Sequence, residues 1–372
     1  MRSRSAFVVT PPEDGWQVVQ GTARFLHGGE RYRALADRIL SPHAEVVHLD
    51  WVPDTLREVL DARLPEADAL VIAPWLPWPD VLDLPDFDEA RLLRAPNLEV
   101  VAGTFDFRLG WIDLDAAARH GVTLVDTSRT MTWTVAEFGV AITLALLRDI
   151  PAAIDAVRNG GWFEAPKGDE GYVFRDLADC RIGLAGYGSI NRHYRSFVQP
   201  YGCAATIYDP FVADDVTAAD AVARAGSLVE LARTSDILVV AIPPTPSTLG
   251  VIDAKVIEAL ARGSLFVLLS RMAVVEQDAL WRRVRAGELR AAVDVFDPEP
   301  PLSDAWFRRD PNVLPTPHIA GNTRFAHERC FAEACADAAR VLNDEAPHHG
   351  ASVRDKRLYD GTLVAVAERD QA

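Results

Sequence analysis

Apolar residues in the first third of the chain gather in short runs, separated by stretches with helical spacing. Five of these runs are rich in β-branched residues and predict strands at residues 6–10, 44–49, 69–73, 98–102 and 122–125. The runs have no polar face, so each strand is expected to be covered on both sides, as in a parallel sheet flanked by helices.

A second series of the same kind begins near residue 181. Its apolar runs predict strands at residues 182–185, 205–208, 237–242, 265–269, 291–295 and 313–314. Between the two series, apolar residues recur at helical spacing over residues 134–157, until Gly160 and Gly161 end the pattern. The alternation predicts an α/β protein of two doubly wound parallel sheets with one long helix between them.

The end of the chain adds one more helix. Residues 323–342 have helical spacing, and a polar tail follows. These residues are too few for a third domain of usual size, so the helix is expected to complete the first domain. We therefore predict a discontinuous domain of residues 1–140 and 322–372, and a second domain of residues 141–321.

Composition and charge argue against several classes of function. Of 372 residues, 54 are Asp or Glu and 38 are Lys or Arg, which gives a formal net charge of -16. So acidic a surface repels phosphate backbones, and we expect no nucleic-acid partner. The N-terminus lacks the apolar segment of a signal peptide, and the most apolar stretch, residues 138–147, has about half the length of a membrane span.

The cysteines and the other metal-binding residue types indicate neither a disulfide scaffold nor a metal site. The four cysteines form no Cys-x-x-Cys pair, which fits a reducing compartment. No grouping of His, Cys, Asp and Glu has the spacing of metal ligands. We predict a cytoplasmic protein with no bound metal and no membrane partner.

A glycine-rich loop follows the first strand of the second series. The strand leads directly into Gly186-Tyr187-Gly188-Ser189-Ile190, and a helical pattern comes next. In this context Gly186 permits a tight turn, and Gly188 lets the backbone approach a pyrophosphate at the N-terminus of the helix. The loop predicts a dinucleotide site.

An acidic residue at the end of the next strand completes the fingerprint. Asp209, in the sequence Tyr208-Asp209-Pro210, lies roughly 20 residues after Gly186, where a carboxylate can bind a ribose 2'-hydroxyl. A carboxylate there repels a 2'-phosphate, so NAD(H) is expected over NADP(H). Asn191 stands where a third glycine would let the helix pack closely, which predicts either a slightly displaced helix or a weakened cofactor site.

These and other segments give the chain a specific resemblance to the NAD-dependent D-2-hydroxyacid dehydrogenases, which include D-lactate, glycerate, phosphoglycerate and formate dehydrogenases. The resemblance extends from about residue 95 to residue 327 and implies a flavodoxin-like substrate domain, a Rossmann cofactor domain and an active-site cleft between them. The segments that carry it are Ile112-Asp113-Leu114 with Ala116-Ala117, Val135-Ala136-Glu137, the glycine-rich loop, Thr245-Pro246-Ser247-Thr248, Ser270-Arg271, Asp294-Val295-Phe296-Asp297-Pro298-Glu299-Pro300 and Thr316-Pro317-His318-Ile319-Ala320-Gly321.

The resemblance implies a catalytic set of Arg271, Glu299 and His318, each just after a predicted strand. Oxidation of a 2-hydroxy acid needs a base for the hydroxyl proton while a hydride leaves C2, and histidine is the side chain that titrates nearest neutrality. His318 is thus the expected acid/base, with Glu299 as its carboxylate partner. Arg271 offers a planar fork to the substrate carboxylate.

The resemblance also implies which residues surround the cofactor. Asp294 would face the nicotinamide carboxamide, although an acid that caps a turn at the end of a strand is a competing interpretation. The complete predicted set is Gly186, Tyr187, Gly188, Ser189, Ile190, Tyr208, Asp209, Pro210, Ala241, Ile242, Pro243, Leu269, Ser270, Arg271, Asp294, His318 and Gly321.

The loop that holds the substrate carboxylate in most members of the family is altered in this chain. The corresponding residues 102–113 are longer and bulkier, and only Gly103 and Thr104 carry over. We expect Arg108, or the pair Phe105 and Phe107, to select a side chain unlike that of lactate; alternatively, Arg108 is a solvated loop cation. The predicted substrate-binding residues are Gly103, Thr104, Arg108, Arg271 and His318.

The leading hypothesis is an NAD-dependent enzyme that interconverts a 2-keto acid and an (R)-2-hydroxy acid. One alternative is a catalytically weak NAD(H)-binding regulatory protein of the same fold. Another is an enzyme that acts on formate or a phosphonate-like acid, although Glu299 stands where formate dehydrogenases generally have glutamine. The resemblance further suggests a homodimer formed through the cofactor domains and the helix near residues 134–157.

Overall fold

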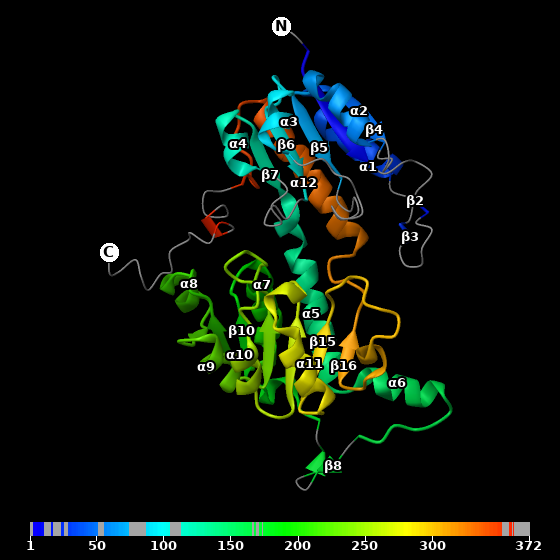
Figure 1. Cartoon of the computed structure of the whole chain (residues 1–372), viewed down its shortest axis with the longest axis vertical. Coiled ribbons are helices and arrows are strands. Elements are labelled where there is room, and N and C mark those ends of the chain that lie inside the picture. The colour runs from blue at the N-terminus through cyan, green and yellow to red at the C-terminus, as the bar shows by residue number, and fades with distance from the viewer. Residues whose placement is uncertain are drawn as a thin grey trace. The chain divides into compact units, whose positions relative to one another are not determined.

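The chain forms two compact units in the computed structural model (Figure 1). Unit 1 comprises Met1–Met131 and Thr323–Lys356, and unit 2 comprises Thr132–Asn322 and Arg357–Ala372. The residues that the structure describes are 3–10, 16–17, 24–25, 29–50, 56–73, 87–104, 113–165, 167–168, 171–172, 174–351, 357–358 and 360.

Unit 1 contains a parallel sheet of five strands. Their spatial order places the first strand between the second and the third, which is the flavodoxin-like order. All five strands were predicted to within two residues at each end. In order across the sheet they are β4 (Glu45–Asp50), β1 (Ser5–Thr10), β5 (Ala69–Ile72), β6 (Val100–Gly103) and β7 (Thr123–Asp126).

Helices cover both faces of this sheet because its strands are apolar on both sides. Ala6 and Val8 of β1 pack with one helical layer, and Phe7 and Val9 pack with the other. The first layer consists of α1 (Gly29–Leu40) and α12 (Arg324–Leu342), and the second of α2 (Leu56–Arg63), α3 (Glu89–Leu93) and α4 (Leu114–Arg119). The helix at the end of the chain thus contributes to the core of unit 1.

Unit 2 contains a parallel sheet of seven strands in the Rossmann order, extended by one strand. Six strands were predicted to within two residues; the short edge strand β12 was missed, because Ala223 and Arg224 are both exposed and give no apolar signal. Across the sheet the strands are β12 (Ala223–Arg224), β11 (Ala205–Tyr208), β10 (Ile182–Ala185), β13 (Ile237–Val240), β14 (Ser264–Leu268), β15 (Leu289–Val293) and β16 (Val313–Pro315). The predicted fold class, with two doubly wound parallel sheets, is confirmed.

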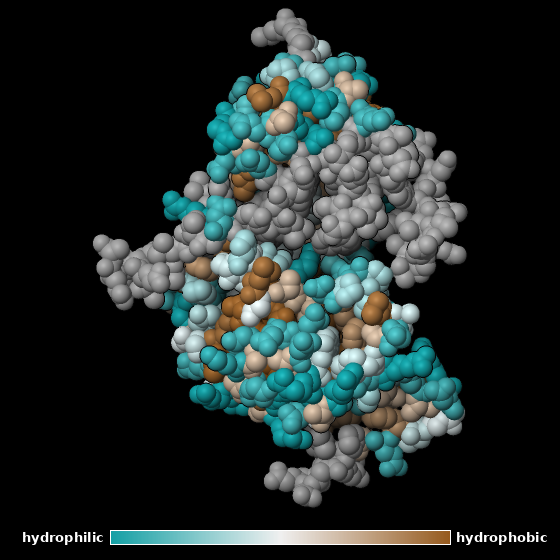
Figure 2. Space-filling view, viewed as in Figure 1, coloured by the Kyte–Doolittle hydropathy of each residue, from teal (hydrophilic) through white to brown (hydrophobic). Residues whose placement is uncertain are grey.

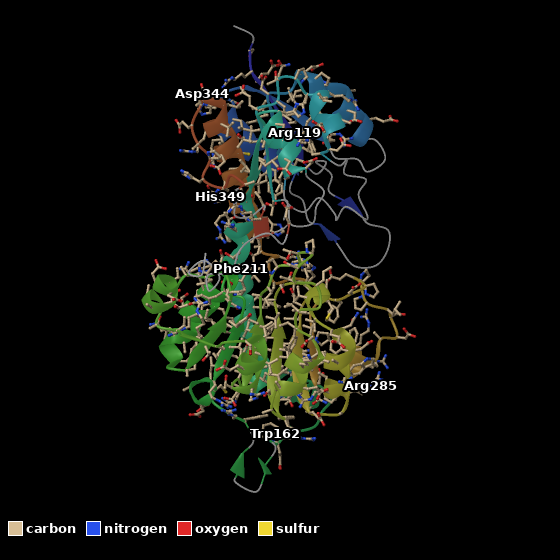
Figure 3. The ribbon with its side chains drawn as sticks, turned by 60° about the vertical axis from the view of Figure 1, so that its left-hand side comes forward. Arg119, Trp162, Phe211, Arg285, Asp344 and His349 are labelled. Carbon is tan, nitrogen blue, oxygen red and sulfur yellow. The ribbon has the colours of Figure 1, made fainter. Side chains whose placement is uncertain are left out.

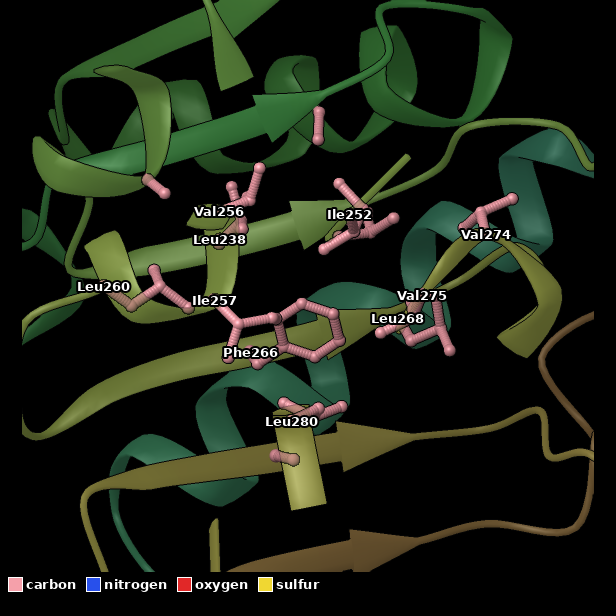
Figure 4. Close-up of a cluster of buried hydrophobic side chains, with 14 of the residues drawn as sticks. Leu238, Ile252, Val256, Ile257, Leu260, Phe266, Leu268, Val274, Val275 and Leu280 are labelled. Carbon is pink, nitrogen blue, oxygen red and sulfur yellow. The ribbon is translucent and has the colours of Figure 1, made fainter. Parts of the chain in front are cut away.

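The sheet of unit 2 also lies between two helical layers. One layer includes α5 (Thr132–Leu147) and α7 (Ser189–Val198). The other includes α9 (Leu228–Arg233), α10 (Ala254–Ala259) and α11 (Gln277–Arg285). Figure 4 shows Ile257 of α10 and Leu280 of α11 beside Phe266 in this core. The remaining elements are α6 (Ile150–Arg158), α8 (Asp214–Ala219) and two antiparallel pairs, β2 (Trp16–Gln17) with β3 (Arg24–Phe25) and β8 (Lys167–Gly168) with β9 (Gly171–Tyr172).

The long helix predicted over residues 134–157 is two helices, so that prediction is wrong. α5 ends at Leu147, and α6 begins at Ile150. Between them Asp149 has a φ of 52°, which interrupts helical geometry. Pro151 has no backbone N–H and would clash with the carbonyl of Leu147 in a continuous helix, so it is tolerated only in the first turn of a new helix.

α5 is apolar enough to be either a buried helix of a protein core or a membrane-spanning helix. The segment Thr127–Leu147 has a mean hydropathy of 1.5 and passes the length and composition test for a membrane span. Within it, Ala136, Ile142 and Leu146 are buried in the core of unit 2, as expected for residues 138–147 as a buried helix. Hydrophilic residues cover much of the visible described surface (Figure 2).

Candidate functional site

The predicted cofactor and catalytic residues of unit 2 follow the carboxyl ends of its strands. Because the strands are parallel, these ends lie at one edge of the sheet, where doubly wound proteins bind ligands. The loops after β10, β11, β14, β15 and β16 therefore define a candidate active site within unit 2.

The glycine-rich loop after β10 has the geometry of a phosphate-binding turn. Gly186 has a φ of 77°, which favours glycine, and a Cβ atom there would be tightly placed, 3.0 Å from Ile242 Cγ1 and 3.2 Å from the Ala241 oxygen. A Cβ at Gly188 would meet no described atom within 4 Å, which leaves room above the loop. Gly188 also caps α7 without a side chain, so the first N–H groups of α7 suit a pyrophosphate.

Asp209 follows β11 beside this loop. Its Oδ2 accepts a hydrogen bond from the Tyr187 N–H at 2.8 Å, and its Oδ1 accepts one from the Phe211 N–H at 2.8 Å. The carboxylate is thus fixed against the glycine-rich loop, where the fingerprint requires an acid for the ribose. The residues present fit a dinucleotide.

Arg224 is a neighbour of this region that the sequence did not indicate. Its Nη1 donates to the backbone oxygen of Asp209, and its Nη2 donates to that of Val212, both at 2.6 Å. Nη2 also lies 3.3 Å from the Asp214 carboxylate. Arg224 lies on the edge strand β12, outside any recognisable motif, so only the structure could place it beside the Asp209 turn.

The structure brings Glu299 and His318 into contact. Glu299 Oε2 lies 2.9 Å from His318 Nδ1, and Glu299 Oε1 accepts a hydrogen bond from the Phe296 N–H at 3.0 Å. Burial raises the pKa of Glu299, but the hydrogen bond and charge of His318, with smaller effects of the Phe296 N–H and the Arg271 charge, outweigh it and lower the pKa overall. Glu299 is therefore held as a carboxylate.

Arg271 follows β14 and completes the predicted catalytic set. Its Nη1 donates to the Ser270 backbone oxygen at 2.8 Å, and its charge contributes to the lowered pKa of Glu299. The residue before it, Ser270, has a buried Oγ with no hydrogen-bond partner among the described residues. A guanidinium, a carboxylate and an imidazole thus lie at the same edge of the sheet.

Asp294, at the end of β15, holds the turn that carries His318. Its carboxylate accepts hydrogen bonds from Thr316 Oγ1 at 2.7 Å, the Ile319 N–H at 3.0 Å and the Ala320 N–H at 2.9 Å. His318 itself has a φ of 53°, and its N–H donates to the Asp294 backbone oxygen at 2.8 Å. Burial raises the pKa of Asp294, and the hydrogen bonds of the turn oppose that shift.

This geometry bears on the two interpretations of Asp294. The hydrogen bonds of Asp294 are those of an acid that caps a turn, and they fix the residues on either side of His318. Contact with a nicotinamide carboxamide stays a prediction. The sequence signal for the positioning role was weak, because it consists only of an acid at the end of a strand.

The other predicted cofactor residues also flank the loop or the strand ends. The Ala241 N–H donates to the Ala185 oxygen at 3.0 Å, which places the segment of Ala241, Ile242 and Pro243 next to Gly186. Leu269 is buried after β14, and its N–H donates to the Val240 oxygen at 2.9 Å. The remaining members of the set are Ser189 and Ile190 in the first turn of α7, Tyr208 at the end of β11, Pro210 after it, and Gly321 after His318.

Two of the predicted substrate-binding residues lie at the end of β6 in unit 1. Thr127 Oγ1 donates to the Gly103 oxygen at 3.0 Å and lies 3.1 Å from Thr104 Oγ1. These contacts fix the first residues after the strand. Arg108, together with Phe105 and Phe107, lies outside the described residues.

Comparison with known proteins identifies the family. Residues 140–320 match the family model described as D-isomer specific 2-hydroxyacid dehydrogenase, NAD binding domain. D-3-phosphoglycerate dehydrogenase of Mycobacterium tuberculosis is 28% identical over 312 residues, which are 84% of this chain and 56% of that protein. The chain thus spans little more than half the length of this relative.

Solved structures show the same fold. A 2-hydroxyacid dehydrogenase from Ketogulonicigenium vulgare has a TM-score of 0.71 at 22% identity, with 95% of this chain and 99% of that chain covered. An NADPH-dependent glyoxylate/hydroxypyruvate reductase from Sinorhizobium meliloti has a TM-score of 0.70 at 20% identity, with 97% and 100% covered. Residues 140–320 thus form the NAD-binding domain of the D-isomer specific 2-hydroxyacid dehydrogenase family, a family of oxidoreductases. The resemblance found in the sequence is confirmed.

Proposed function

We propose that the protein interconverts a 2-keto acid and an (R)-2-hydroxy acid, with NAD(H) as the redox partner. The observation that carries this proposal is the contact of 2.9 Å between Glu299 and His318, beside the cation of Arg271. A carboxylate, an imidazole and a guanidinium at the carboxyl edge of a dinucleotide-binding sheet are the groups that the reaction requires.

In the reductive direction, NADH supplies a hydride to C2 of the keto acid when it is bound. His318 donates a proton to the carbonyl oxygen, and the transfer of hydride and proton would leave the hydroxy acid, NAD⁺ and a neutral imidazole. Because Glu299 lies on Nδ1, Nε2 is the ring nitrogen that transfers this proton. In the oxidative direction His318 accepts the hydroxyl proton.

The other two residues act on charge and orientation. The Glu299 carboxylate stabilises the imidazolium and fixes the orientation of the ring. The Arg271 guanidinium binds the substrate carboxylate through two parallel hydrogen bonds and polarises the neighbouring carbonyl. Gly103, Thr104 and Arg108 are proposed to contribute to the binding of substrate.

The test is the oxidation of NADH, followed by absorbance, against short, branched, aromatic and doubly anionic 2-keto acids. The expected result is turnover with one class of keto acid that disappears in His318→Ala. NADH binding without turnover on any member of the panel would contradict the proposal and favour a regulatory NAD(H)-binding protein.

We propose a preference for NAD(H) over NADP(H). The Asp209 carboxylate lies against the glycine-rich loop and would repel a 2'-phosphate, and the guanidinium of Arg224 is engaged with two carbonyls and Asp214. We expect kcat/KM to be at least about tenfold higher with NADH than with NADPH, and Asp209→Ala to narrow the difference. A higher value with NADPH would contradict the preference.

We propose that the protein is a homodimer in the cytoplasm. α6 carries Ile150, Ile154 and Val157 on one helical face, and their exposed fractions are 43%, 43% and 56%. An apolar face of this kind suits a second copy of the chain. Light scattering after size exclusion should give twice the monomer mass, and Ile154→Glu should give the monomer at an unchanged melting temperature. A monomer for the unmodified protein would contradict the proposal.

A further inference from the structure

Asn191 occupies the position of the third glycine in the fingerprint, and its side chain is fully buried. The residue lies in the first turn of α7, directly below the glycine-rich loop. Its Nδ2 donates to the Gly186 oxygen at 2.6 Å and to the Ala185 oxygen at 3.2 Å. A side chain thus occupies the space that a glycine leaves for close packing, and it bonds to the loop.

The Gly186 oxygen belongs to the same peptide unit as the Tyr187 N–H. That N–H donates to Asp209 Oδ2 at 2.8 Å. One planar peptide is therefore held at both ends, at its carbonyl by the amide of Asn191 and at its N–H by the carboxylate of Asp209. Rotation of this peptide would break both hydrogen bonds together.

The orientation of this peptide matters because Gly186 is the most permissive residue of the turn. Its φ of 77° lies in a region that glycine enters easily, but glycine can also adopt many other conformations. The peptide leads directly to Gly188 and the first N–H groups of α7. A loop already fixed in its binding geometry loses less conformational entropy when a ligand binds.

In the described residues, the amide of Asn191 forms hydrogen bonds only through its NH₂ group. Its Oδ1 is buried and has no hydrogen-bond partner among the described residues. A buried acceptor without a partner carries a desolvation cost. Because the unsatisfied acceptor lowers the stability of the folded protein, stability alone does not explain Asn191, and its hydrogen bonds to the loop point to a role there.

We propose that Asn191 is a positioning residue for the cofactor. Its amide locks the Gly186–Tyr187 peptide against Asp209 and so pre-forms the surface that takes the pyrophosphate and the adjoining ribose of a dinucleotide. The inference rests on the proposed use of NAD(H). Asn191 would then strengthen the binding of the cofactor, whereas a defect in the fingerprint would weaken it.

The test is the affinity for NADH and for ADP-ribose, measured by calorimetry with unmodified protein and with Asn191→Gly, Asn191→Ala and Asn191→Asp. We expect both ligands to bind about tenfold more weakly to the Gly and Ala variants, because the loop loses its amide donor. Asn191→Asp should bind most weakly, because a carboxylate of the same shape cannot donate and repels the two carbonyls. Tighter binding by Asn191→Gly would overturn the proposal.

Tyr194→Phe is the matched control on the same helix. Tyr194 is fully buried and donates to Thr143 Oγ1 of α5 at 3.0 Å, so its loss removes one buried hydrogen bond that does not involve the glycine-rich loop. We expect a lower melting temperature and unchanged affinity for both ligands. Equal losses of affinity in Tyr194→Phe and Asn191→Ala would show a merely structural role and overturn the proposal.

A second readout needs no cofactor. Hydrogen exchange of the Tyr187 amide should become faster in Asn191→Ala, because that N–H is the other end of the locked peptide. Unchanged exchange would contradict the lock even if turnover were lost. If the unmodified protein fails to bind NADH, the proposed function fails as well, whereas normal NADH binding by all variants overturns only the role of Asn191.

Discussion

Two histidine–carboxylate pairs in the described residues have the same contact geometry and different surroundings. In unit 2, His318 Nδ1 lies 2.9 Å from Glu299 Oε2; in unit 1, His349 Nδ1 lies 2.9 Å from Asp337 Oδ2. The Glu299 side chain is 30% exposed and the Asp337 side chain only 1%. A short contact between an imidazole and a carboxylate therefore does not identify a catalytic pair by itself.

The hydrogen bonds around Asp337 and Glu299 explain why the surroundings of the two carboxylates differ. Asp337, on α12, also accepts the backbone N–H groups of His348 at 2.9 Å and His349 at 2.7 Å, and the following Gly350 forms a bridge with Val125 of β7. This pair attaches the segment around His349, which Figure 3 labels, to unit 1. Glu299 instead shares its second oxygen with one N–H and lies near the charge of Arg271.

The largest effect on turnover is expected from His318→Ala. Loss of the proton donor should lower kcat of NADH oxidation about 10³-fold, while the melting temperature changes little. His349→Ala is the matched variant and should keep kcat near that of the unmodified protein. Steady-state kinetics and thermal denaturation check both, and equal losses of kcat would remove the distinction between the pairs.

The next largest effect is expected from Arg271→Lys. A lysine keeps the charge but cannot form two parallel hydrogen bonds, so kcat/KM for the keto acid should fall about 100-fold. Arg290→Lys serves as the control, because Arg290 contacts the Leu146 oxygen and Asp149 at the end of α5. A similar loss of kcat/KM in both variants would argue against a substrate contact for Arg271.

A smaller effect is expected from Glu299→Gln. The pKa of Glu299 is lowered, so this carboxyl is protonated only at pH values below the ordinary range of a glutamate, and its charge stabilises the imidazolium throughout the neutral working range. Without that charge, kcat should fall about tenfold, and the alkaline limb of reduction should move about one unit to lower pH. Glu288→Gln is the control, since the pKa of that carboxyl is also lowered, chiefly by the Arg283 hydrogen bond. An unmoved pH profile in Glu299→Gln would contradict its proposed role.

The smallest effect on turnover, with a clear effect on stability, is expected from Asp337→Asn. Asparagine keeps one acceptor oxygen, but its NH₂ group replaces the other, so either the hydrogen bond of His348 or the contacts of His349 are lost. The free energy of unfolding should fall by about 3 kcal/mol. Urea denaturation measures the loss, and kcat/KM of the remaining folded protein should be unchanged. A full loss of activity with unchanged stability would mean that the second pair also takes part in catalysis.

The sequence predicted the sheets because their strands are apolar on both faces, as in 237–240, where every residue is buried. It missed the break between α5 and α6, because the helical spacing continues through Asp149, although Pro151 is a signal for a new helix. It also missed β12, which is too short and exposed to give a pattern. Local periodicity predicts helices and strands, but it does not reveal a residue with left-handed backbone geometry inside a periodic segment.

The candidate site was predictable where a motif carries it and not elsewhere. Glu299 and His318 were expected together from the resemblance, and the structure brings them into contact. The contacts of Asn191, Arg224 and Asp337 depend on which backbone groups of other segments face them. No spacing in the chain encodes those partners, so they required the structure.

The most direct test of the central claim follows the hydride itself. The protein is mixed with NADH that carries deuterium at the transferable C4 position and with the pooled 2-keto acids, and the products are analysed by mass spectrometry and chiral chromatography. We predict an (R)-2-hydroxy acid that carries the deuterium at C2, formed by the unmodified protein and by His349→Ala but not by His318→Ala. Deuterium that stays on the bound cofactor with every keto acid would contradict the assignment.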